Sequence, residues 1–412
     1  MNYLAIFARA PVVLLFLFAD CKREDSVVKT YTLNVTAING TVVKNPNLAV
    51  YNIGDIVQLT ATSNSGYTFT SWSGDVTDST NPLSVTMNAN KNITANFTIP
   101  VNVNVKSTGA TGNDSTDDTK AIQTAIDQVA GTGGTVLIPA GTYMINAVTS
   151  LNLKSDMTLK MESGAILKAI PNNNGQYNII KLSSVTKVNI VGGTLQGERA
   201  SHLGTTGEWG MGIGIYGSSD VILNNITAKD CWGDGFYIGG TITSTNITLD
   251  NVISDNNRRQ GLSITSADGV VVKNSVFKNT NGTAPMAGID IEPNAGRVAR
   301  NVLIIDNDCS NNQTCGIIVQ TNNATVTNNN VHDNGSGILI IQGASENRVT
   351  NNTVTNNNRL FSPGFSWYHN GGITITTKAT GNTITGNTVK GNKPHNIYDA
   401  VGGNTISGNI VD

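Results

Sequence analysis

The fold of this chain is decided by a short glycine-led stretch, Gly288-Ile-Asp-Ile291, whose pattern occurs seven times in the chain. In each copy an apolar residue follows the glycine, and a second apolar residue follows two positions later. The seven copies start 21 to 35 residues apart and are Gly212–Ile215, Gly235–Ile238, Gly261–Ile264, Gly288–Ile291, Gly316–Val319, Gly337–Ile340 and Gly372–Ile375. A unit this short cannot bury its apolar face alone, so successive units must stack.

The segments between these copies are also strand-like. They are β-branched and are divided by Asn and Gly, as in Val221–Ile226 and Val270–Val276, and no helical spacing interrupts them. Asn tolerates the left-handed backbone of tight turns and can form ladders from one coil to the next. The pattern therefore predicts an all-β chain folded as a right-handed parallel β-helix, with rungs about 4.8 Å apart.

One rung of this β-helix carries two carboxylates. Side chains alternate across a strand, so Ile289 and Ile291 are expected to point inward, whereas Asp290 and Glu292 point outward. Their backbones are then about 7 Å apart on one face. Two acids this close raise each other's proton affinity, as a general acid requires, and inverting glycosidases use a carboxyl pair about 6.5–9.5 Å apart. We predict a catalytic pair; the alternative is a solvated acidic rung.

Neighbouring rungs supply further candidates. Asp234 precedes Gly235, about 10 Å along the stack, and is predicted to be a third catalytic acid or else a turn-capping residue. Arg258, Arg259 and Gln260 lie one rung away from the acidic pair. Guanidinium groups there would clamp a sugar carboxylate or sulfate; alternatively they pair with nearby aspartates.

Two long insertions end just before the glycine column, Glu198–Trp209 and Arg359–His369. We expect them to overhang the face that carries the acids, because long loops on a rigid scaffold often bind ligands. The residues predicted to bind substrate are Arg258, Arg259, Gln260, Arg297, Trp209, Tyr237, Trp367, Tyr368 and His369.

The composition argues against a nucleic-acid partner, and the N-terminus indicates the cellular location. The net charge is −2 and only 13% of residues are charged, so no basic stripe points to nucleic acid. Residues 1–21 are predicted to be a signal peptide, with Arg9 before the short apolar run Val12–Ala19. The residues before Cys21 resemble a degenerate bacterial lipobox. We expect a monomer that is extracellular or on the cell surface. It is either secreted or held at the membrane only by a lipid anchor on Cys21.

The remaining cysteines leave two structural possibilities. After Cys21, the chain holds Cys231, Cys309 and Cys315, so at least one thiol is unpaired. Cys309 and Cys315 either bridge one turn or fill positions in the wall of the coil.

Two segments resemble known families. Residues 29–98, with Gly66–Asp75 and Asn90–Phe97, resemble the divergent internalin-B-type repeat, which implies a small β module for spacing or attachment. Thr108–Thr119, the helical pattern Lys120–Val129 and the strand Gly133–Tyr143 resemble the opening of the pectate-lyase-like superfamily. This resemblance implies a β-helix over residues 101–412, with its open end plugged by an N-terminal capping helix.

The site resembles its families only in part. Polygalacturonases share the superfamily, and Asp234 fits the place of their first aspartate, but Met286-Ala287 stand where later motifs belong. The Asp-Pro-His triplet of mannuronan epimerases is missing. Calcium-dependent β-helix lyases carry Asn, Glu-x-Glu and Lys at the spacing of Gln260, Asp290-x-Glu292 and Arg297. That likeness implies Ca²⁺ on Asp290 and Glu292.

Three functions remain open from the sequence. The leading hypothesis is a secreted or surface glycoside hydrolase that cleaves an anionic polysaccharide without a cofactor. The second is a calcium-dependent polysaccharide lyase or C5-epimerase, with Arg297 near the abstracted proton. The third is a non-catalytic, glycan-binding adhesin.

Overall fold

A computed structural model describes residues 28–358 and 371–412. The predicted signal peptide, Cys21, and the binding candidates Trp367, Tyr368 and His369 lie outside these residues. Within them, no helix is long and apolar enough to cross a membrane.

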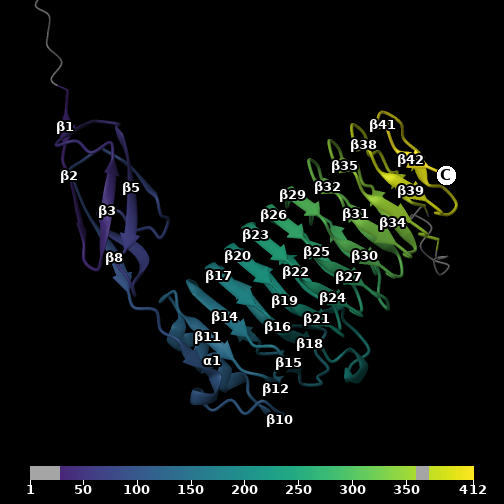
Figure 1. The fold of residues 1–412 in the computed structure, drawn as a ribbon, viewed down its shortest axis with the longest axis horizontal. Coiled ribbons are helices and arrows are strands. Elements are labelled where there is room, and N and C mark those ends of the chain that lie inside the picture. Colours follow the sequence, from purple (N-terminus) through teal and green to yellow (C-terminus); the bar gives the residue numbers. More distant parts are fainter. Residues whose placement is uncertain (1–27, 359–370) are drawn as a thin grey trace, which may run out of the picture. The chain divides into compact units, whose positions relative to one another are not determined.

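The N-terminal strands form two three-stranded sheets and one strand pair (Figure 1). One sheet has the order β2-β8-β6, the other β3-β5-β7, and β1 pairs with β4. Trp72 is fully buried here and donates its indole N–H to the Thr80 carbonyl, which identifies it as a core residue. The strands are β1 (Thr30–Tyr31), β2 (Leu33–Ala37), β3 (Gly40–Asn45), β4 (Tyr51–Asn52), β5 (Ile56–Ser63), β6 (Thr68–Gly74), β7 (Leu83–Thr86) and β8 (Lys91–Thr98).

The rest of the described chain is a parallel β-helix, confirming the predicted fold. Three long sheets run along it, and each strand pairs in parallel with the equivalent strand of the next coil (Figure 1). Sheet I carries the glycine column and consists of β13 (Leu151–Asn152), β16 (Gln176–Ser183), β19 (Trp209–Tyr216), β22 (Phe236–Gly239), β25 (Leu262–Ile264), β28 (Ile289–Ile291), β31 (Cys315–Val319), β34 (Ser336–Ile340), β37 (Ile373–Ile375) and β40 (Ile397–Asp399).

The other two sheets have twelve strands each. Sheet II consists of β10 (Asn113–Asp117), β12 (Gly141–Ile145), β15 (Ala165–Ala169), β18 (Thr194–Gln196), β21 (Thr227–Lys229), β24 (Ile253–Asp255), β27 (Val276–Lys278), β30 (Asp308–Ser310), β33 (Asn330–His332), β36 (Thr353–Thr355), β39 (Thr388–Lys390) and β42 (Ile410–Val411). Sheet III consists of β9 (Val103–Asn104), β11 (Thr135–Ile138), β14 (Met157–Met161), β17 (Thr186–Val191), β20 (Ser219–Asn224), β23 (Ser244–Asp250), β26 (Ala267–Lys273), β29 (Ala299–Ile305), β32 (Thr325–Thr327), β35 (Arg348–Thr350), β38 (Thr383–Thr385) and β41 (Thr405–Ser407).

Helix α1 (Thr119–Val129) is the predicted capping helix. It buries Ile122, Ile126 and Val129 against β9, β11 and β13, where the first coils would otherwise expose the core. Two 3₁₀ turns, η1 (Val105–Thr108) and η2 (Arg199–Ser201), complete the helical elements of the described chain.

Buried asparagines join successive coils in ladders. Asn352 is typical: its amide donates to the Val326 carbonyl at 2.9 Å and to Asn387 Oδ1 at 3.0 Å. Its own Oδ1 accepts from both the backbone and the amide of Asn329. The ladders satisfy backbone groups at tight turns that sheet pairing leaves unpaired.

The three described cysteines are buried and free of disulfides. Cys309 packs in the main core among inward-facing residues, whereas Cys315 belongs to a smaller apolar cluster with Ile318 and Leu339. Of the two possibilities that the sequence left open, the structure therefore shows wall positions and no bridge.

Candidate active site

The candidate site lies on the outer face of sheet I, where the register stacks Tyr237 beside Ser263 and Ser263 beside Asp290. Coils approach closely here because of the glycine column. A Cβ atom on Gly261 would lie 2.3 Å from the Gly288 carbonyl oxygen, so only glycine fits. The predicted alternation is correct, since Ile289 and Ile291 are fully buried in the main core.

Asp290 faces outward, as the alternation predicts, but it is neither a solvated acid nor accessible to a substrate. Its exposed fraction is 0%, because side chains from both neighbouring coils cover it. Gln260 Nε2 donates to Asp290 Oδ2 at 2.6 Å, and Gln320 Nε2 donates to Oδ1 at 3.1 Å. The amide oxygen of Gln260 accepts from the Ala287 backbone N–H, which fixes that amide. Gln260, predicted to bind substrate, instead positions Asp290.

Burial and the neighbouring Glu292 carboxylate raise the pKa of Asp290 to about 7, although hydrogen bonds from the two glutamines oppose the shift. Partial burial also raises the pKa of Glu292, against the attraction of the Arg259 guanidinium. Both shifts favour the protonated form of the pair, which is the direction that general acid chemistry requires.

A second acidic cluster lies two coils away. Asp234 is fully buried, accepts a hydrogen bond from Ser263 Oγ at 2.7 Å, and pairs with Arg259 Nη1 at 3.1 Å. Burial raises the pKa of Asp234, and the Arg259 guanidinium limits that rise. On its other side, Arg259 Nε lies 3.9 Å from Glu208 Oε1. Asp234 is therefore one half of an ion pair and not a lone turn cap, and Arg259 joins two carboxylates.

These residues surround a cavity of about 400 Å³, which we call the acidic cavity. Its polar lining is Gln176, Glu208, Arg259, Thr265, Glu292 and Asn294. Trp209, Met211, Tyr216 and Tyr237 supply the apolar lining, and the Trp209 side chain is exposed. Aromatic faces beside carboxylates suit a sugar ring. Glu292 and Glu208 line this cavity, whereas Asp290 and Asp234 lie beneath its surface.

The insertion 198–209 places Glu208 and Trp209 at the cavity. Glu198 accepts hydrogen bonds from Tyr177 and from His202 Nδ1, and the His202 ring stacks on Trp232 at 3.9 Å. From the sequence, Glu208 is indicated only as part of an insertion that is expected to overhang this face. Gln320 occupies an outward position in the repeat, which is the signal that would have identified it.

Arg258 and Arg297 do not reach the acidic cavity. The Arg258 guanidinium lies 3.8 Å from the centroid of the Trp232 ring and donates to the Gly207 carbonyl, so it supports the insertion. Arg297 lines a different cavity.

A calcium ion fits this arrangement poorly. Asp290 is fully buried and each of its oxygens already accepts from an amide N–H, so it is not accessible to an ion, and the raised pKa of both acids opposes the ionised form that Ca²⁺ needs. Among the described residues, no group of three or more His, Cys, Asp or Glu side chains is arranged to hold a metal.

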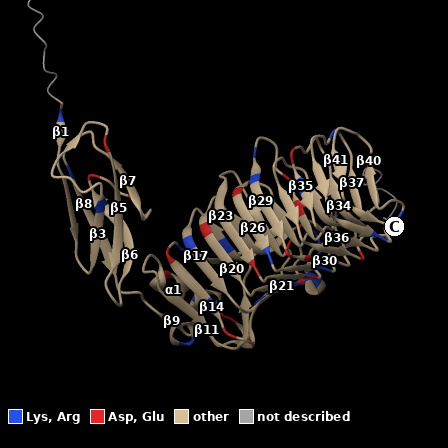
Figure 2. Ribbon diagram, turned by 45° about the horizontal axis from the view of Figure 1, so that its top comes forward, with Lys and Arg blue, Asp and Glu red and all other residues tan. Residues whose placement is uncertain are grey.

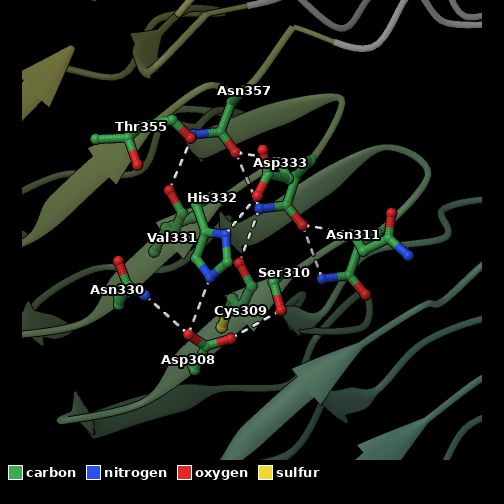
Figure 3. Close-up of polar contacts among 12 residues, drawn as sticks. Asp308, Cys309, Ser310, Asn311, Asn330, Val331, His332, Asp333, Thr355 and Asn357 are labelled. Atoms are coloured by element: carbon green, nitrogen blue, oxygen red, sulfur yellow. Dashed lines mark hydrogen bonds and ion pairs between the residues drawn. The ribbon is translucent and has the colours of Figure 1, made fainter. Parts of the chain in front are cut away.

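Another ionisable cluster lies on sheet II, around His332 (Figure 3). His332 Nε2 lies 3.0 Å from Asp308 Oδ2, and Nδ1 lies 2.7 Å from Asp333 Oδ2. Hydrogen bonds to both carboxylates raise the pKa of His332, although partial burial opposes this. Ser310 Oγ and the Asn330 amide donate to the same Asp308 carboxylate, so the cluster is a hydrogen-bonded network between coils. Elsewhere charged residues are scattered along the coils (Figure 2).

Comparison with known proteins agrees with this fold. Residues 149–296 and 294–389 match the model of the right handed beta helix region, which spans more than half of the chain. The chain belongs to the right-handed β-helix family. Residues 102–193 match rhamnogalacturonase A/epimerase, pectate lyase-like proteins, and residues 31–100 match the divergent InlB B-repeat domain, in agreement with both sequence resemblances.

Curated relatives are distant. The uncharacterized protein YclG of Bacillus subtilis (strain 168) is 28% identical over 266 residues, 57% of this chain and 44% of that protein. Mannuronan C5-epimerase AlgE3 of Azotobacter vinelandii is 28% identical over 59% of this chain and 12% of its own. Exo-poly-alpha-D-galacturonosidase of Dickeya chrysanthemi is 27% identical over 65% and 43%, respectively. The chain thus spans less than half the length of each.

Solved structures share the fold at low identity. The A-module of mannuronan C-5 epimerase AlgE6 from Azotobacter vinelandii has a TM-score of 0.53 and 21% identity, covering 75% of this chain and 99% of that one. PfbA, a surface adhesin of Streptococcus pneumoniae, has a TM-score of 0.56 and 16% identity, covering 76% and 93%. Because epimerases and an adhesin share the fold, function must be argued from the site.

Proposed function

We propose that this protein is a glycoside hydrolase that cleaves an anionic polysaccharide in the acidic cavity. The observation that carries the proposal is that two carboxylates, Glu208 and Glu292, line one cavity beside exposed aromatic surface. Curated relatives named for mannuronan and polygalacturonate support a polysaccharide as the substrate.

The two carboxylates have different roles. Glu292 is the general acid, because partial burial raises its pKa and so favours the protonated form that an acid needs. The proton passes to the glycosidic oxygen as the bond from that oxygen to the anomeric carbon breaks. Glu208 takes a proton from the water whose oxygen attacks that carbon. Among the acids of the described site, Asp234 and Asp290 are buried and held by other side chains, so Glu208 is the second one within reach.

The buried residues position this pair. Charge repulsion between Glu292 and Asp290 raises the pKa of Asp290 and, because it is mutual, favours the protonated form of the pair. The Asp234–Arg259 ion pair holds the guanidinium 3.9 Å from Glu208, and its charge also lowers the pKa of Glu292. Asp290 and Asp234, expected from the sequence to be catalytic, therefore act here as positioning residues.

Glu292→Gln tests the proposal. It removes the proton that the leaving oxygen needs, so kcat is expected to fall by about 10²–10⁴. Glu162→Gln, an exposed change away from the cavity, serves as the control with unchanged kcat. Purified protein is incubated with alginate, polygalacturonate and iota-carrageenan, and both reducing ends and ultraviolet absorbance are recorded.

The same assay separates the rival functions. Hydrolysis gives reducing ends without new absorbance, and a chelator leaves the rate unchanged. New absorbance that disappears with the chelator would instead establish the calcium-dependent lyase. Binding without turnover on every polymer, unchanged in Glu292→Gln, would favour the glycan-binding adhesin.

A further inference from the structure

A second cavity lies next to the acidic cavity, toward the C-terminal coils. Its volume is about 430 Å³, and its lining comes from the start of β29 and from the segments that follow β28, β31 and β34. We call it the amide cavity, because Gln320, Asn322, Asn323 and Gln342 line it. Side-chain amides both donate to and accept from sugar hydroxyl groups.

No acidic residue of the described chain lines the amide cavity, but two arginines do, Arg297 and Arg300. Arg300 is already paired with Asp268 at 2.8 Å. Arg297 is exposed and forms no ion pair with any carboxylate of the described chain. Its guanidinium is therefore available to hold a ligand anion in a bidentate contact.

The acidic cavity has the opposite character. Its one guanidinium, Arg259, already contacts Asp234 and Glu208, and Glu292 and Asp290 lie close by. A negatively charged sugar group placed there would face several carboxylates, with no free cation among the described residues. The charged group of an anionic substrate is therefore expected to bind outside the acidic cavity.

The two cavities meet at one coil. Glu292 lines the acidic cavity, and the adjacent Pro293 lines the amide cavity. Gln320 lines the amide cavity while its Nε2 donates to Asp290. The next coil lies only about 4.8 Å further along the axis, so one polysaccharide chain can occupy both cavities.

We infer that the amide cavity, through Arg297, binds the carboxylate or sulfate of the polysaccharide, so that its charged group lies toward the C-terminal coils from the bond that is cleaved. The inference rests on the proposed function for the location of that bond. It makes Arg297 a residue of substrate recognition and not a catalytic base.

The test measures binding in the Glu292→Gln background, where cleavage does not interfere. Dissociation constants are measured by titration calorimetry for polygalacturonate and its carboxyl-reduced, neutral form, and for iota-carrageenan and its desulfated form. Arg297→Gln should weaken binding of an anionic polymer roughly tenfold and leave its neutral form unaffected. Arg297→Lys should restore part of the loss, and the salt dependence should diminish in Arg297→Gln.

Arg348→Gln is the matched control, since Arg348 is an exposed arginine on sheet III that lines neither cavity. If Arg297→Gln weakens binding of polygalacturonate but not of its carboxyl-reduced form, the ligand of Arg297 is a carboxylate. If it weakens binding of iota-carrageenan but not of its desulfated form, the ligand is a sulfate. Equal weakening by Arg297→Gln and Arg348→Gln would overturn the inference and leave hydrolysis standing on Glu292. Failure of all four polymers to bind would also overturn it. Arg297-dependent binding without turnover in the unmodified protein would support the inference while refuting hydrolysis.

Discussion

At the scale of single residues, the main result is the burial of Asp290. An acid whose pKa is raised on folding binds a proton more tightly in the folded protein than in the unfolded chain. The contribution of Asp290 to stability is therefore greatest below the pKa that its carboxyl group has in the unfolded chain. This contribution is lost as the pH rises through about 7. The buried Asp290 carboxylate thus lowers the stability of the fold above pH 7. Such a loss is expected at a residue that serves the activity, here through its effect on Glu292.

Asp290→Asn tests this trade-off. The neutral amide removes the cost of a buried charge, and Gln320 Oε1, which has no partner, can rotate to accept from it. We expect the free energy of unfolding to rise by roughly 2 kcal/mol at pH 8 and to change little at pH 4, while kcat falls. Denaturant unfolding at the two pH values measures the difference. An equal change at both pH values would contradict the raised pKa.

How far the sequence predicts the site also depends on single residues. Alternation in Gly-Ile-Asp-Ile correctly places Asp290 and Glu292 on the outer face, because strand geometry alone determines it. Their exposure could not be predicted, since the covering amides of Gln260 and Gln320 come from coils about 30 residues away in the sequence. For the same reason, the pattern could not separate Arg258, which stacks on Trp232, from Arg259.

At the scale of elements, the asparagine ladders hold the coils together. The sequence predicts turns at Asn and Gly, and left-handed backbone at Asn351 and Asn356 agrees with that prediction. The residue that forms the ladder is the next one in the chain, Asn352 or Asn357, whose amide turns inward. The partners of each amide depend on the register between neighbouring coils. That register could not be predicted, because the repeat length varies from 21 to 35 residues.

Asn352→Ala should destabilise the β-helix by about 2–4 kcal/mol. The change leaves the Asn329 backbone N–H buried without a partner and removes the amide's hydrogen bonds to the Val326 carbonyl and to Asn387. Asn358→Ala, at an exposed asparagine six residues further on, is the matched control and should stay within about 0.5 kcal/mol. Urea unfolding followed by circular dichroism gives both values. Comparable losses in the two variants would show that ladders contribute no more than surface asparagines.

At the scale of the whole molecule, stability and function are distributed along a stack in which each coil contacts its neighbours. The main core is continuous from α1 to the last coils, and α1 closes its N-terminal end. All residues that line the acidic cavity lie between Gln176 and Asn294. None comes from β1–β8, so the N-terminal strands contribute no group to the proposed chemistry.

A chain that begins at residue 99 should therefore keep its activity. The remaining coils retain α1 as their cap and every side chain of both cavities, so we expect kcat on a soluble polymer to stay within about twofold of the full chain. The measurement compares reducing-end formation by the two proteins at equal concentration, after circular dichroism has established that both are folded. A folded but inactive shortened protein would show that residues 29–98 take part in turnover, which would rule out a role limited to spacing or attachment.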